Sequence, residues 1–327
     1  RAAPYYVSAL AAALGFKMGL FNIGVDGQYR IAALLAAAAG AAVELPAVLH
    51  VAFIFAVAIV VGSLYAGIAG VLKVKRGVNE VIATIMLNYI ATGTIAYLLT
   101  RWLKEDNAGT VGVTKTKPIP SSGWLPNLNN LISKFGFHIT GIRLSSYVIV
   151  AIVLGIGFYL LVNRTRFGFD LRASGINPAA ARAAGVNPGR MVIITMLLSG
   201  GIAGLVGMGP VLSDIHFFEA SGGQFPLQLG FTGIGVALLG RNHPAGIALA
   251  AFVYAGIERS TQVLPTIGMP PEISRILQGT LILSSVIAYE VVRRRAEAAA
   301  VRAASRGHTI ASEAGEPLVG RTEGAPL

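Results

Sequence analysis

Long apolar stretches alternate with short polar ones along most of this chain. A helix of about 20 apolar residues crosses the ~30 Å hydrocarbon core of a bilayer. Inside lipid every backbone N–H and C=O must be paired, which a helix achieves by itself and an open sheet does not. We therefore expect an all-α, polytopic membrane helix bundle with about 8–10 transmembrane helices, some of them short or broken. The clearest spanning runs are residues 47–72, 77–100, 145–162, 191–208 and 276–292.

Residues 22–28 interrupt this pattern with a polar, glycine-containing stretch. The apolar run that follows, residues 31–43, is too short to span unless the polar stretch itself lies at membrane depth. A carboxylate such as Asp26 costs about 2.5–3.5 kcal/mol at the centre of a membrane helix, so it lies near the interface or faces a wet cavity. A plain cytoplasmic turn and a helix break beside a transport path both fit. Residues 210–228 are also apolar but rich in helix breakers, and a short apolar run follows them, so they are similar to residues 22–43.

Composition agrees with a membrane protein. Hydrophobic residues make up 54% of the 327 residues and charged residues only 13%, against roughly 25% charged in soluble domains. The net charge of +11 comes from basic residues at the ends of apolar runs. That distribution follows the positive-inside rule, so we expect no nucleic-acid partner.

The residue inventory also argues against an enzyme. The chain has no cysteine, and its five histidines are scattered without ligand spacing, so no disulfide, metal site or cofactor is expected. No nucleotide-binding pattern G-x-x-x-x-G-K-[ST] occurs. We assign no catalytic residues, and any energy for transport must come from another protein.

Basic clusters predict which side of the membrane each connection occupies. Lys73, Lys75 and Arg76 follow one spanning run, and five arginines lie in residues 164–190, which places both in the cytoplasm. The polar residues 102–144 then form an external loop. Within a transmembrane domain of residues 1–295, counting crossings places Arg1 outside, so at least one helix is expected before it. Residues 296–327 are expected to be a disordered cytoplasmic tail.

The run GFDLRASGINPAAARAAGVNP, residues 168–188, predicts a short helix within the cytoplasmic loop. Asn177 is a good N-cap, Pro178 is tolerated in a first turn, and Gly185 is a natural stop. A helix of about two turns is unstable alone in water, so it needs a docking partner. An ordinary solvated loop is the alternative.

This loop resembles the coupling-helix loop of permease subunits of bacterial ABC importers, in the branch that handles ribose, branched-chain amino acids and nucleosides. FNIGVDGQ (residues 21–28) and GVNEVIATIMLNYIA (residues 77–91) are similar to the nucleoside and simple-sugar permeases of that branch. GFTGIGVALLGRNHPAGI (residues 230–247) fits the same family. These four stretches are distributed along the chain from about residue 20 to residue 247.

The resemblance implies a permease subunit in the bacterial cell membrane that forms a path for a small molecule, a nucleoside or a related simple sugar. ATP hydrolysis would belong to a separate ABC ATPase subunit. A second permease subunit, a surrounding shell of membrane lipid and an external substrate-binding lipoprotein would complete the importer. The substrate-path candidates are Asn22, Asp26, Gln28 and Asn88. The residues implied to contact the ATPase are Arg172, Ser174, Asn177, Pro178, Ala181, Arg182, Ala184 and Gly185.

Some assignments stay open at this stage. Asn88 lies about 12 Å along its helix, and its amide is expected either to bond another helix or to contact substrate. Glu80 is expected to be a capping charge at a helix start. The small residues Ser199, Gly200, Gly201, Gly204 and Gly207 predict close helix packing.

The leading alternative function is an ion-gradient-driven secondary transporter or channel. Such a mechanism requires charged residues within the membrane helices, and only Asp26 lies near such a position.

Overall fold

The computed structural model describes residues 1–105, 114–129, 145–219, 228–260, 263–268, 270, 272–274, 276–284, 287 and 291. The chain divides into two compact units, Arg1–Gln278 and Gly279–Leu327, and the fold below is that of the first unit. Across the described residues the regular structure is helical, and extended pairing is limited to isolated bridges. The predicted all-α class is confirmed. The predicted tail at residues 296–327 lies outside the described residues.

Short irregular turns accompany the α-helices. Two of the described turns are π-helical, η1 (Leu99–Leu103) and η3 (Val211–Ile215), and two are 3-10, η2 (Ser121–Gly123) and η4 (Leu264–Ile267). The described α-helices, in chain order, are α1 (Ala2–Phe16), α2 (Val25–Ala41), α3 (Ala47–Arg76), α4 (Glu80–Leu98), α6 (Tyr147–Arg164), α7 (Arg166–Ile176), α8 (Pro178–Ala183), α9 (Pro188–Leu205), α10 (Met208–Pro210), α11 (Leu229–Leu239) and α12 (Pro244–Ser260).

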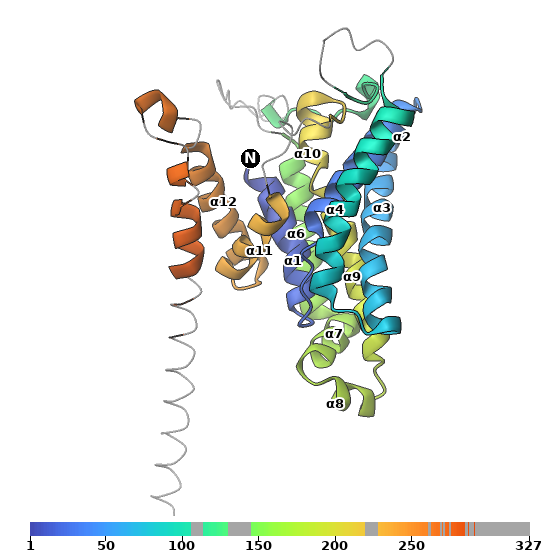
Figure 1. The fold of residues 1–327 in the computed structure, drawn as a ribbon, viewed down its shortest axis with the longest axis vertical. Coiled ribbons are helices and arrows are strands. Elements are labelled where there is room, and N and C mark those ends of the chain that lie inside the picture. The colour runs from blue at the N-terminus through green and yellow to red at the C-terminus, as the bar shows by residue number, and fades with distance from the viewer. Residues whose placement is uncertain are drawn as a thin grey trace, which may run out of the picture. The chain divides into compact units, whose positions relative to one another are not determined.

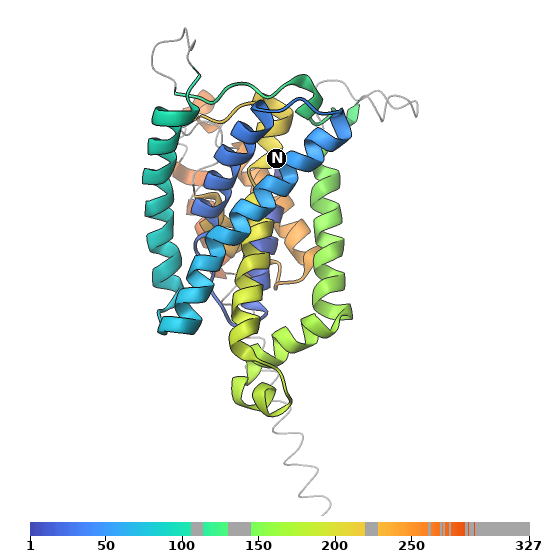
Figure 2. The same cartoon turned by 90° about the vertical axis from the view of Figure 1, so that its right-hand side faces the viewer.

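Four helical stretches of the described part are long and apolar enough to cross a membrane: Ala47–Arg76, Glu80–Leu103, Tyr147–Arg164 and Pro188–Ile215. Helices α1 and α11 are apolar but shorter. The long helices run side by side, with α7 and α8 projecting beyond them at one end and residues 114–129 at the other (Figures 1 and 2). This is the architecture of a multi-pass membrane protein.

The two basic regions that the sequence assigns to the cytoplasm lie at the same end of the bundle. Lys73, Lys75 and Arg76 occupy the last turn of α3, and the ribbon places that turn near the end from which α7 and α8 project (Figure 1). Residues 114–129 lie at the opposite end. The described residues of the predicted cytoplasmic loop 164–190 and residues 114–129 of the predicted external loop thus lie at opposite ends of the bundle. Which side of the membrane each end faces stays a prediction.

Helices α3 and α9 pack through glycine. A Cβ added at Gly204 would overlap the carbonyl oxygen of Ala58, and one added at Gly200 would overlap the carbonyl oxygen of Gly62. Small residues allow such close backbone approach between membrane helices. The stripe that begins at Ser199 thus packs as the sequence predicts.

Replacing Gly204 by alanine should destabilise the bundle, because the new methyl group can be accommodated only by moving the α3 and α9 backbones apart. Overpacking of this kind costs about 1–3 kcal/mol. The apparent melting temperature of the detergent-solubilised protein should fall by several degrees. Gly157→Ala is the matched control, since no atom lies within 4 Å of a Cβ placed there. An equal effect of the two substitutions would contradict the packing argument.

Candidate translocation path and coupling segment

The chain between α1 and α2 folds back into the bundle. It turns at Gly19, which has a φ of +71°, and the Leu20 N–H then donates to the Gly15 carbonyl, at 3.0 Å. Helix α2 begins at Val25, a fully buried residue. The polar stretch is therefore a helix break inside the protein rather than a plain turn at its surface.

Two buried amides hold this break against α9. The Asn22 Nδ2 group donates to Gln28 Oε1 and to Ser199 Oγ, both at 2.9 Å, and Gln28 Nε2 donates back to Asn22 Oδ1 at 2.8 Å. Ser199 Oγ in turn donates to the Ala11 carbonyl, at 2.7 Å. Asn22 and Gln28 are each only 1% exposed. In this conformation the two amides bond each other and fix the break in place.

Asn88 joins α4 to the same break. Its Oδ1 accepts from the Gly27 N–H at 2.8 Å, and its Nδ2 donates to the Ile23 carbonyl at 2.9 Å. The side chain thereby pairs one of the N–H groups that a helix start leaves free. Gly27 permits the approach, because a Cβ there would lie 2.9 Å from Asn88 Oδ1. The geometry matches the helix-to-helix hydrogen bond that the sequence left as one of two options.

Asp26 joins α2 to α11. Its Oδ1 accepts from the Gly230 N–H at 3.1 Å, in the first turn of α11, where the helix dipole favours a negative charge. A Cβ at Gly230 would lie 2.7 Å from the Asp26 nitrogen, so glycine is needed at this contact. Ser8 Oγ donates to the Leu229 carbonyl at 2.9 Å and adds α1 to the junction. Helix α11 therefore starts among α1 and α2, as a second helix that begins inside the bundle.

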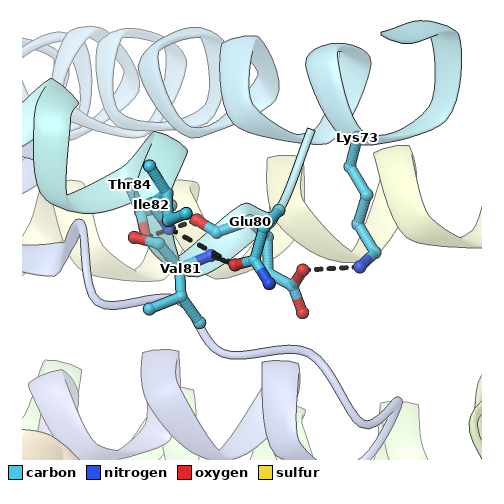
Figure 3. A network of polar contacts seen from close by, with 6 residues as sticks. Lys73, Glu80, Val81, Ile82 and Thr84 are labelled. Atoms are coloured by element: carbon cyan, nitrogen blue, oxygen red, sulfur yellow. Dashed lines mark hydrogen bonds and ion pairs between the residues drawn. The ribbon is translucent and has the colours of Figure 1, made fainter. Parts of the chain in front are cut away.

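The turn between α3 and α4 is closed by an ion pair. Lys73 Nζ lies 2.5 Å from Glu80 Oε2, and the Asn79 side chain accepts from the Val81 and Ile82 N–H groups (Figure 3). Thr84 Oγ1 donates to the Glu80 carbonyl at 2.7 Å. Asn79 is therefore the cap of α4, while Glu80, expected to be the capping charge, lies in the first turn and pairs with Lys73.

The segment at the basic end of the bundle contains two helices. The sequence predicted a loop carrying one short helix, and α8 matches it: Asn177 Oδ1 accepts from the Ala179 and Ala180 N–H groups at 3.1 and 3.0 Å. Gly185 ends this segment with a φ of +84°. The preceding α7 was not predicted, because residues 166–176 are polar and contain two glycines, Gly168 and Gly175, a composition that favours a loop.

Most of the residues assigned to ATPase contact face outward. Arg172 is half-buried and donates to the Val162 carbonyl, while Ser174 and Ala181 are buried against the bundle. Apolar side chains accompany the exposed group, with Phe169 63% and Ile176 85% exposed. An apolar and basic surface at the end of a membrane bundle suits a protein partner. The exposed assigned residues are Asn177, Pro178, Arg182, Ala184 and Gly185.

Helix α7 rests directly on the turn that opens the helix break. A Cβ added at Gly175 would lie 2.7–2.8 Å from the Met18 backbone, and Thr195 Oγ1 of α9 donates to Met18 Sδ at 3.2 Å. Burial, and then the nearby Arg172 guanidinium, lower the pKa of the Lys17 amine. Helix α7 and the helix break are therefore in contact through residues 17–19.

Helices that break inside a membrane bundle are typical of membrane transport proteins. This bundle has such breaks before α2 and α11, and an exposed short helix, α8, at one end. Comparison with known proteins specifies which kind of transport protein this is: residues 1–286 match the family described as branched-chain amino acid transport system / permease component. The chain belongs to that family. It is the non-catalytic, membrane-spanning permease subunit of an ABC importer, and membership implies an ATPase and a binding protein as partners.

Curated relatives cover most of the chain. It is 34% identical to the guanosine ABC transporter permease protein NupP of Bacillus subtilis, over 88% of this chain and 79% of the relative. It is 28% identical to the nucleoside permease NupB of Lactococcus lactis, over 92% and 81%, and 31% identical to the glucose permease TsgB13 of Haloferax volcanii, over 86% and 73%. No solved structure matched the chain. The predicted permease is confirmed, and the ion-gradient alternative is set aside, because an ABC importer is driven by ATP.

Several residues of the break were missed from the sequence. Ser199 lies in the small-residue stripe, and nothing local pairs it with Asn22, 177 positions away. Ser8 and Gly230 carry no signal of their own, because serine and glycine are common in apolar membrane helices. Their roles depend on which helices pack together.

Replacing Asn22 by alanine should destabilise the protein by about 1–3 kcal/mol, because the buried Gln28 amide loses both of its bonds to Asn22 and the Ser199 oxygen loses its donor. The melting temperature of the purified protein measures this effect. Asn163→Ala is the control, since Asn163 is exposed on α6. A loss no larger for Asn22 than for Asn163 would mean that the buried amide network does not hold the break.

Proposed function

We propose that this permease carries nucleosides, with simple sugars as the second candidate class. The observation that supports nucleosides most directly is the 34% identity to a guanosine permease over 88% of the chain; the glucose permease at 31% identity keeps sugars as the alternative. Both classes are neutral and rich in hydroxyl groups. Amide and hydroxyl side chains like those at the helix break suit such ligands, because they exchange hydrogen bonds without binding a charge.

The proposed path runs by the helix break, with Asn22, Asp26, Gln28 and Asn88 beside it. In the present conformation these side chains bond to each other or to backbone. Helix starts of this kind present dipoles to a cavity in many transporters. We propose that the rocking of the bundle exchanges some of these internal bonds for substrate bonds. Weak binding of this kind lets the substrate leave.

The proposed coupling interface is the outward face of α7 and α8. A separate ATPase that grips α8 would move α7, and α7 bears on Met18 at the entrance to the break. Such a rigid-body change is a two-state equilibrium that ATP binding biases from a distance. The second permease subunit and the external lipoprotein complete the proposed importer, with the lipoprotein at the end of the bundle that carries residues 114–129.

Reversing the charge of Arg182 should weaken the hold of the ATPase on this segment. Arg182→Glu is expected to lower both ATPase co-purification and ATP-dependent uptake at least about tenfold, as loss of an interface charge pair does. Gly185→Val should act in the same direction, because a β-branched residue is strained at a positive φ. Arg101→Glu, at the opposite end of the bundle, is the control. Unchanged co-purification and uptake in both segment variants would remove the coupling proposal.

The substrate proposal is tested by uptake. Cells that lack their own nucleoside uptake and express the complete transporter should accumulate labelled guanosine and not labelled glucose. Excess unlabelled guanosine should suppress this uptake at least about tenfold more strongly than excess glucose, as expected where hydrogen-bonding sites discriminate. Accumulation of glucose alone would replace the nucleoside proposal with the sugar alternative.

A further inference from the structure

A second polar cluster lies where α1, α11 and α12 meet, and the sequence reading did not single it out. Its members come from all three helices and from the end of the first compact unit (Figure 1 shows the helices). The cluster consists of Tyr5 on α1, Thr232 on α11, Tyr254 and Glu258 on α12, and Gln278.

The members form a chain of hydrogen bonds. The Tyr254 hydroxyl donates to Gln278 Oε1 at 2.8 Å, and Gln278 Nε2 donates to Glu258 Oε2 at 2.9 Å. The Tyr254 hydroxyl also lies 3.5 Å from Thr232 Oγ1. The rings of Tyr5 and Tyr254 are 5.2 Å apart at 53°. An acid, an amide and two aromatic rings are thus gathered in one place.

Two groups of the cluster, on Tyr5 and Glu258, can make hydrogen bonds that no described residue supplies. Tyr5, Tyr254 and Gln278 are only 3%, 7% and 5% exposed. Among the described residues, the Tyr5 hydroxyl has no hydrogen-bond partner, and only one oxygen of Glu258 has a donor. No ion pair to Glu258 occurs within that part of the chain either. Glu258 is partly exposed near the end of α12, so its second oxygen can accept a hydrogen bond from a ligand.

The cluster also adjoins the helix break. Thr232 lies two residues beyond Gly230, whose N–H donates to Asp26. On α1, Tyr5 lies three residues before Ser8, which donates to the Leu229 carbonyl. The first turn of α11 therefore contacts the candidate path through Gly230 and this cluster through Thr232.

We propose that Tyr5, Tyr254, Glu258 and Gln278 form a binding site for the sugar moiety of the transported molecule, its ribose if the substrate is a nucleoside. The proposal rests on the proposed function for the choice of ribose. Neighbouring hydroxyl groups of a sugar can donate to the free Glu258 oxygen and accept from the Gln278 amide. The tyrosine rings are buried in this conformation, and they supply flat apolar surface for the sugar ring when the proposed rocking of the bundle opens the cluster.

The test is saturation-transfer NMR on the assembled permeases and ATPase in nanodiscs, without the binding protein. Guanosine, 2′,3′-dideoxyguanosine and glucose are the probes. For the wild type, we expect saturation of the ribose protons of guanosine and about tenfold weaker binding of the dideoxy compound, because a site built to bond hydroxyls rejects ligands that lack them. Glu258→Gln should bind guanosine about tenfold more weakly and no longer discriminate.

Tyr254→Phe, which keeps the ring and removes the hydroxyl, gives a second measurement if Glu258→Gln does not assemble. Glu44→Gln is the matched control, because Glu44 is exposed between α2 and α3. Unchanged guanosine affinity and unchanged discrimination in both cluster variants would overturn the site and leave the cluster as a structural tie between α12 and Gln278.

Comparing guanosine with glucose distinguishes a failure of this site from a failure of the proposed function. Saturation of glucose protons but not of guanosine, lost in Glu258→Gln, would support the sugar site and contradict the nucleoside substrate. Absence of any saturation in the wild type would overturn the site, while the uptake assay decides the substrate on its own.

Discussion

The constraint on which this structure depends is that backbone polar groups away from water must be paired, even where a helix begins inside the bundle. Two helices, α2 and α11, begin there. An N–H group at each start is paired by a side chain from another helix: the Gly27 N–H of α2 donates to Asn88, and the Gly230 N–H of α11 donates to Asp26. Each pairing ties two helices together, so the breaks strengthen the bundle that they interrupt.

The bundle therefore combines rigid and exchangeable contacts. Helices α3 and α9 meet through glycines at which a methyl group would clash, and such close packing moves only as a unit. The polar contacts at the breaks are different, because a hydrogen bond to a side chain can be exchanged for one to a ligand at small net cost. A transporter needs both kinds of contact.

The contact between α7 and Met18 gives the two regions a common mechanical element. Gly175 lies against the Met18 backbone, and Met18 also contacts α9 through Thr195. A force on α8 would therefore pass through α7 to Met18, which lies at the helix break and also contacts α9. In the proposed importer, this point converts ATPase motion into a change at the path. The cluster around Glu258 would then contact the substrate near the start of α11, beside Thr232.

Short-range features were set by the sequence alone. Apolar length predicted the spanning helices, and Asn177 with Pro178 predicted the start of α8, because helix propensity and capping act over a few residues. The resemblance of four stretches identified the permease family. Only the tertiary structure decided that Asn22 bonds Ser199, that Asp26 bonds Gly230 and that Gly175 meets Met18. These partners lie far apart in the chain, and apolar helices present similar faces to many neighbours, so their pairing follows from packing rather than from any local pattern.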